Sequence, residues 1–244
     1  MGEAKFSGRL LNVRSFTKSG TYTPGEGVKS IIVKLVGAGA SGGSGITVDA
    51  DSYSAAGGGG GGGGYVEFMV DLAAAKLNQV SIVIGAGGKS VTGQKGNDGG
   101  VTYFGTTIFA TGGGGAGIET RPVSAYTTSV SSLMIIPGLP GQGYFNETNP
   151  AYTLIRTAYG QHGGWGYLGA QGQLGGSGGA SALSGEAYYM GNGAAGDAGT
   201  SAGYGTGGGG SCTFYNVPAP LPLAYNAKPS GAGADGVVLI YEFA

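Results

Sequence analysis

The sequence is poor in the residues on which most enzymatic chemistry depends. It has one histidine, one cysteine and one tryptophan among 244 residues, and only 10% of its residues are charged. A Ser-His-Asp or Cys-His unit would have to centre on His162, whose glycine neighbours instead predict a ring packed between glycine tracts. Cys212 is more typical of a small buried residue than of a nucleophile. We therefore expect no enzyme and no bound cofactor.

Other absences exclude further classes of protein. No apolar run approaches the roughly 18 residues of a membrane span, and the N-terminus lacks the apolar region of a secretory signal. The net charge of -1 leaves no strongly basic stripe for nucleic acid. With a single cysteine, no internal disulfide is available, so the fold does not depend on an oxidising compartment. We expect synthesis in the cytoplasm, no membrane insertion and no nucleic-acid partner.

Metal binding has one weak candidate, the D-x-D pair Asp49 and Asp51. Without further oxygen ligands nearby, this pair is a poor match for Ca²⁺. Solvated loop carboxylates are the simpler interpretation, and we expect no metal site. Whether the pair holds a cation is left open by the sequence.

Glycine is what the sequence has in excess. There are 58 Gly and 9 Pro, whereas ordinary usage of glycine is about 7%. Such a composition is often disordered, yet 41% hydrophobic and 10% aromatic residues with little net charge oppose disorder. We predict a folded chain in which glycine is a packing residue.

A nucleotide-binding role for the glycines fails on local structure. The stretch 31–43, IIVKLVGAGASGG, meets the G-x-G-x-x-G spacing, but the dinucleotide motif needs a helix to begin at its last glycine. Instead, eight consecutive glycines follow at 57–64, and each costs a helix up to about 1 kcal/mol. The stretch GAGGKS at 85–90 has Val83 where a P-loop requires its first glycine.

Strand-like runs occupy the first 111 residues and the last ten. These runs carry β-branched and aromatic residues, several with period-two alternation, between turn residues. Only 70–77 could form a helical turn or two. The last run can pair only with the sheet begun near the N-terminus, so the two ends of the chain should meet. The predicted strands are 9–16, 30–36, 65–72, 79–84, 101–111 and 236–243.

Between residues 112 and 235, short glycine tracts alternate with Tyr-rich segments. Collagen is excluded because no strict G-X-Y register is kept, and an elastic linker has no need of so many aromatic residues. In polyproline-II geometry the chain repeats every three residues and its polar groups point outward. Neighbouring glycine tracts can then pair sideways, so we predict stacked polyglycine-II helices.

The predicted fold is all-β with polyglycine-II. Residues 1–111 plus 236–244 form a β-strand base with the first glycine tracts, and 112–235 form a polyglycine-II body that carries distal loops.

At this point the sequence resembles the glycine-rich domain of phage tail-fibre and tail-tip proteins. The resemblance rests on four stretches: FTKSGTYTPGEGVKSIIVKLVGAGASGG, AAGGGGGGGGYVEFMVDL, LNQVSIVIGAGGKS with GNDGGVTYFGTTIFATGGGGAG, and GADGVVLIYEFA. The middle of the chain is similar in texture to tail-tip adhesins of T-even-like phages. The resemblance implies a polyglycine-II sandwich whose loops at one end bind the bacterial surface.

The Tyr-rich segments are the candidate receptor-binding elements. Tyr with Ser, Gly and Asn provides rigid amphipathic area beside adaptable hydrogen bonds, although aromatic residues that fold inward as core are the alternative. We expect the segments 118–136, 144–159, 186–190 and 211–229 to form the binding end. The candidate residues are Tyr126, Tyr144, Phe145, Tyr152, Tyr159, Tyr188, Tyr189, Phe214, Tyr215 and Tyr225.

The predicted function is receptor binding without chemistry, at the tail tip or tail fibre of a virion. The implied partners are a bacterial outer-membrane protein, pilus or lipopolysaccharide, and other tail-fibre or baseplate proteins. Phage fibres are commonly trimeric, and a homotrimer would gain avidity. The alternatives are a structural assembly protein, an ice-binding protein and a depolymerase. Release of reducing sugar from host polysaccharide would reveal the depolymerase.

Overall fold

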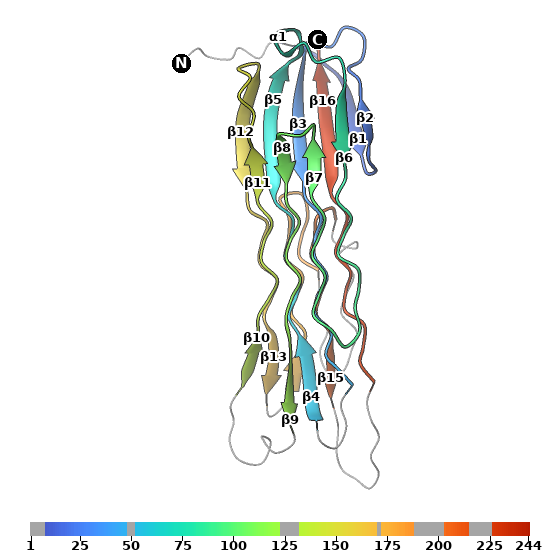
Figure 1. The fold of residues 1–244 in the computed structure, drawn as a ribbon, viewed down its shortest axis with the longest axis vertical. Coiled ribbons are helices and arrows are strands. Elements are labelled where there is room, and N and C mark those ends of the chain that lie inside the picture. The colour runs from blue at the N-terminus through green and yellow to red at the C-terminus, as the bar shows by residue number, and fades with distance from the viewer. Residues whose placement is uncertain (1–7, 48–51, 123–131, 170–171, 188–202, 215–225) are drawn as a thin grey trace.

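A computed structural model shows an elongated molecule with β-sheets at both ends and parallel runs of glycine-rich chain between them (Figure 1). It describes residues 8–47, 52–122, 132–169, 172–187, 203–214 and 226–244. Over these residues the protein is all-β, with four antiparallel sheets. The helix α1 (Leu72–Ala75) spans only four residues, and no described helix is long and apolar enough to cross a membrane.

The first sheet of the base joins the two ends of the chain. Its antiparallel order is β1 (Leu10–Phe16), β16 (Val237–Phe243), β3 (Ser30–Val36), β5 (Tyr65–Asp71) and β12 (Tyr152–Ala158). Side chains of β3, β5 and β16 alternate between buried and partly buried along each strand, as period-two patterning requires. The predicted meeting of the chain ends is confirmed.

The second sheet of the base covers one face of the first. Its order is β11 (Gly143–Phe145), β8 (Ile108–Ala110), β7 (Thr102–Phe104), β6 (Val80–Val83) and β2 (Gly20–Tyr22). The main hydrophobic core lies between the two sheets. Phe68 of β5 packs in this core, with its ring centroid 5.1 Å from that of Phe104.

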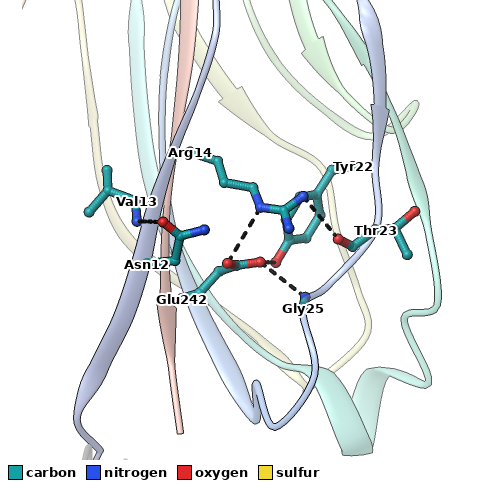
Figure 2. A network of polar contacts seen from close by, with 7 residues as sticks. All are labelled: Asn12, Val13, Arg14, Tyr22, Thr23, Gly25 and Glu242. Atoms are coloured by element: carbon teal, nitrogen blue, oxygen red, sulfur yellow. Dashed lines mark hydrogen bonds and ion pairs between the residues drawn. The ribbon is translucent and has the colours of Figure 1, made fainter.

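A polar network around the buried Glu242 ties the two base sheets together (Figure 2). Glu242 of β16 is 1% exposed. Its Oε1 accepts hydrogen bonds from the Tyr22 hydroxyl at 2.9 Å and from the Gly25 amide at 3.2 Å. Arg14 of β1 places its Nε 3.5 Å from Oε2. The buried carboxylate is therefore paired and hydrogen-bonded, as burial of a charge requires.

In the body, the glycine tract 57–64 changes hydrogen-bond partner at every residue. Every third amide donates to the same neighbouring segment, so the partners repeat with a period of three. The segment 205–211 accepts from Gly57, Gly60 and Gly63, through the carbonyls of Ser211, Gly208 and Gly205. The segment 111–117 accepts from Gly58, Gly61 and Gly64, through Gly117, Gly114 and Thr111. The segment 161–164 accepts from Gly59 and Gly62, through Gly164 and Gln161.

The carbonyls of the same tract follow the same period. They accept from three other segments: 37–43 through Gly43, Ala40 and Gly37, 138–141 through Gly138 and Gly141, and 176–179 through Gly176 and Gly179. Six segments therefore surround the tract, and it is fully buried along its length. A three-residue period is that of the polyproline-II conformation; the polyglycine-II geometry of the tracts stays a prediction.

This close packing explains the run of glycines. A Cβ atom added at any position from 57 to 64 would overlap a backbone atom of a neighbouring segment. At Gly61, for example, the obstacle is the carbonyl of Leu139. Glycine is used here for close approach of backbones, and not for a phosphate or a turn.

Two smaller sheets lie at the end of the body opposite the base, called the distal end here (Figure 1). One has the order β10 (Leu133–Ile135), β13 (Gly166–Gly169), β14 (Gly172–Leu174), and the other β15 (Cys212–Phe214), β4 (Ser52–Gly57), β9 (Ile118–Pro122). A small core of Ala56, Ile135, Leu168 and Cys212 joins them.

The predicted division at residue 111 therefore needs correction. Strands β11 and β12 belong to the base although they lie within 112–235. Strand β4 lies at the distal end although it precedes residue 111. The chain crosses the body repeatedly, so each end of the molecule is assembled from segments far apart in sequence.

Candidate functional site

The sequence predicted that the segment 144–159 belongs to the binding end, but the structure places it in the base. Its first and last parts form β11 and β12, edge strands of the two base sheets. Most residues of β12 are exposed, because an edge strand has one neighbour and its outer face is uncovered. Because burial does not alternate along β12, its sequence does not need to alternate between apolar and polar residues. For this reason the segment resembles a recognition loop in sequence.

Tyr144 lies on the outer face of the base. Its ring stacks on that of Phe109, with centroids 4.8 Å apart and an interplanar angle of 19°, and Phe109 packs on Tyr103 at 5.3 Å. The Tyr144 hydroxyl donates to Oε1 of Gln142 at 3.1 Å. Since Tyr144 and Phe109 are directly opposed across β11 and β8, these rings form cross-strand pairs that stabilise the sheet.

Phe145 and Tyr152 pack against the core of the base. Both lie near Phe68, with ring centroids 5.8 Å and 6.4 Å from it. Burial raises the pKa of the Tyr152 phenol, and the nearby Glu147 carboxylate raises it further. Both side chains match the alternative left open by the sequence, in which aromatic residues supply core.

Five of the other candidates, Tyr126, Tyr188, Tyr189, Tyr215 and Tyr225, lie outside the described residues. Phe214 ends β15, where it is paired with Ser54 of β4 at the distal end.

Tyr159 is the candidate that the structure places on the body surface. It begins the tract 159–165, which runs from β12 in the base toward β13 at the distal end. Tyr159 is 63% exposed, and Trp165 is 54% exposed. His162, midway between them, is also exposed. We call these three residues the ring row.

The three-residue spacing of the ring row follows from the hydrogen bonds of its tract. Gly160 and Gly163 donate to the carbonyls of Gly141 and Gly138, on one neighbouring tract; Gln161 and Gly164 donate to the carbonyls of Ala180 and Ser177, on another. The amides of two of every three residues are thus bonded to neighbouring tracts, and the residues between them, His162 and Trp165, are exposed, as is Gln161. The prediction of a His162 ring packed between tracts is wrong for this reason.

Apolar side chains also extend from the adjacent tract. Ile136 is 67% exposed and Leu139 is 65% exposed, again three residues apart. Their carbonyls accept from Gly117 and Gly114, which fixes the backbone while the side chains meet solvent.

A second exposed group lies across the outer face of the sheet β10–β13–β14. Met134 is opposite Tyr167, and Tyr167 is opposite Leu174; all three are exposed, whereas Ile135 and Leu168 are buried. We call Met134, Tyr167 and Leu174 the distal row. Large exposed apolar patches in monomers commonly mark binding sites.

Sequence reasoning missed the distal row and Trp165. Met134 falls within the predicted binding segment 118–136, but it was not singled out. For Trp165, the available signal was a ring recurring at three-residue intervals along a glycine tract, at 159, 162 and 165.

Metal-ligating side chains do not gather in the described part of the chain. No cluster of three or more His, Cys, Asp or Glu is positioned there to hold a metal ion, and Asp49 and Asp51 lie outside it. Cys212 is fully buried, with its thiol 3.8 Å from the Gln173 carbonyl oxygen. Its predicted role as a small buried residue is confirmed.

Comparison with known proteins gives one family. The sequence matches the family described as a glycine-rich domain over residues 15–242. No curated protein matches the chain.

Proposed function

Because the chain belongs to the glycine-rich domain family, we propose that it is a non-enzymatic adhesin of a phage tail tip or tail fibre. In this proposal it binds a receptor on the bacterial surface and is located in the virion. The observation that carries the proposal is the distal row, an exposed apolar face at the end of the molecule opposite the first and last strands.

The two ends of the molecule, the base and the distal end, suit attachment at the base and recognition at the distal end. The first and last of the described strands, β1 and β16, pair in the base, and the distal end of the molecule lies opposite them (Figure 1). A partner at the base would be another tail-fibre or baseplate protein, and copies of the chain grouped as a trimer would gain avidity.

The body supports recognition by being ordered before binding. Every amide of the tract 57–64 has a backbone acceptor, and the neighbouring tracts are anchored to sheets at one or both ends. A surface that is already ordered loses less conformational entropy when a receptor binds. The distal row also lies on a hydrogen-bonded sheet, so its side chains project from fixed backbone.

Adsorption to bacteria tests the proposal. The purified protein, displayed on fluorescent beads, is incubated with a panel of strains beside a distal variant, Met134→Ser with Tyr167→Ser. A control variant, Ile155→Ser, removes an apolar side chain that is 51% exposed in the base. We expect adsorption to some strains, retained by the control and lost by the distal variant.

A structural assembly protein is the second candidate. Leu10 and Val13 of β1 are 48% and 47% exposed on the base, and such apolar surface suits contact with another tail component. Adsorption to no strain, from a protein shown to be folded, would favour this candidate over the adhesin.

A further inference from the structure

We propose that the ring row is a second binding site, which takes an extended, uncharged polysaccharide chain along the side of the body. The site comprises Tyr159, His162 and Trp165. It goes beyond the adhesin proposal, because it lies on the body and is independent of the distal row.

The spacing of the rings suits a long and repetitive ligand. Three residues of extended chain span roughly 9–10 Å, so the three rings recur evenly along one line. The ends of the row are then about 18–20 Å apart. A compact ligand would need rings that converge on one point, whereas a row in single file presents the same contact repeatedly.

The chemistry between the rings complements a sugar. Pyranose rings present C–H groups that pack on aromatic faces, and their hydroxyls require hydrogen-bond partners. Among the described residues, no backbone hydrogen bond uses the amide of His162 or the carbonyls of Gly160 and Gly163. The Gln161 side chain belongs to an exposed residue of the same tract. Aromatic rings therefore alternate with polar backbone groups along the row.

The row stands on fixed backbone. The amides of Gly160 and Gly163 lie 3.0 and 3.1 Å from the carbonyl oxygens they bond, and those of Gln161 and Gly164 lie 2.8 and 2.6 Å from theirs. Weak contacts that recur along a chain add up when the protein pays little entropy to hold them in place. Rings on a flexible segment would lose this advantage.

Charge selects among polysaccharides. The tracts 136–142, 159–165 and 175–181 contain no Asp, Glu, Lys or Arg. Recognition of a sulfated, phosphorylated or uronic-acid chain would call for Arg or Lys beside it. The geometry therefore points to a neutral glycan and predicts binding that changes little with salt.

Trp165 makes the site directly observable, because it is the only tryptophan of the chain. The full-length protein is titrated with soluble neutral linear polysaccharides, a β-glucan, an α-glucan and a galactomannan, and with an anionic polyuronate. Trp emission and its quenching by acrylamide are recorded. We expect at least one neutral chain to protect Trp165 from quenching and to retard the protein in affinity electrophoresis.

The variants separate the row from other exposed aromatic residues. Binding by the Tyr159→Ala variant is measured from Trp emission. Binding by the Trp165→Ala variant, which has no tryptophan, is measured by affinity electrophoresis. Each substitution should weaken binding about three- to tenfold. Tyr204→Ala removes a tyrosine that is 43% exposed outside the row and should leave binding unchanged. Circular dichroism confirms that each variant is folded.

Three results would overturn the inference: no protection by any neutral chain, protection that is unaffected by Tyr159→Ala, or preference for the polyuronate. Protection of Trp165 that grows with protein concentration alone would instead assign the row to contact between copies. Failure of the adhesin proposal is read separately, from adsorption of the Met134 and Tyr167 variant, which leaves the ring row intact.

Discussion

The hydroxyl of Tyr22 donates to Oε1 of Glu242 at 2.9 Å and so joins residues that are 220 positions apart in sequence. Tyr22 comes from β2 of the second base sheet and Glu242 from β16 of the first, so the bond links the sheets as well as the two ends of the chain. It is buried, which makes an unpaired partner costly.

Tyr22→Phe should lower the free energy of unfolding by about 1–3 kcal/mol, since it removes a donor to a buried carboxylate and leaves the ring in place. Urea unfolding followed by circular dichroism measures the change. Tyr144→Phe is the matched control, because its hydroxyl bonds only the side chain of Gln142 on a half-buried face; it should change stability by less than about 0.5 kcal/mol. Equal losses in the two variants would contradict the role of the buried bond.

Alkaline pH should destabilise the base. Burial raises the pKa of both Tyr22 and Tyr65 well above the ordinary range, and hydrogen bonds to the Glu242 and Glu67 carboxylates raise it further. A raised pKa in the folded state gives stability that is present below the unfolded value of about 10 and is lost as pH rises above it. Urea unfolding between about pH 8 and 11 should show this fall.

The control for alkaline pH is the double variant Tyr22→Phe with Tyr65→Phe. Its stability should depend less on pH over the same interval, because neither ring can ionise. Phenolate absorbance in the folded wild-type protein that appears for every tyrosine at the ordinary pKa would show that these two hydroxyls are not held neutral.

Glu147 should make a small contribution that is lost in acid. The amide of Asn149 is the largest cause of its lowered pKa, and the Thr107 hydroxyl and the Thr148 amide lower it further. A lowered folded pKa gives stability that is present above the unfolded value of about 4.3 and is lost as pH falls through the folded value. Glu147→Gln should therefore be less stable than wild type at neutral pH and equal to it in acid.

Thermal melts at neutral and acid pH measure this difference. Because Glu147 is partly exposed to solvent, which screens its interactions, the effect should be modest. A difference between the two proteins that persists unchanged in acid would mean that the charge of Glu147 is not its cause.

Gly61→Ala should unfold the body or cost more than about 3 kcal/mol, since its Cβ would overlap the Leu139 carbonyl in a tract that cannot move aside. Gly185→Ala is the control, because a Cβ there meets no atom within 4 Å. Its free energy of unfolding should match that of the wild type or rise by about 0.4–1 kcal/mol, because alanine lowers the conformational entropy of the unfolded chain. Differential scanning calorimetry distinguishes the two, and tolerance of Gly61→Ala would refute close packing of this tract.

The strands of the base were the most predictable part of the fold. The run 30–36 is predicted as a strand and forms β3 (Ser30–Val36), because its apolar residues Ile31, Val33 and Leu35 face the core at every second position. The short helix within 70–77 also forms, with Asp71 accepting hydrogen bonds from the amides of Ala73 and Ala74.

The placement of the later segments could not be predicted from the same signals. Strand β12 is exposed along most of its length, so its sequence carries no alternation to show which sheet it joins. For the tracts, glycine is compatible with any neighbour, and the sequence therefore does not state which segments lie side by side. The ring row could not be predicted from the sequence, because the neighbours of 159–165 determine which of its residues are exposed.

The change of partner at every residue of the tract 57–64 limits how such a domain can vary in length. Inserting one glycine would turn all later residues by a third of a revolution and present each amide to the wrong neighbour. Inserting three would restore the orientation, but the six surrounding segments would then be too short unless they lengthened with it. Length variation is therefore confined to the connections at the two ends, which can diverge while the interior keeps its register.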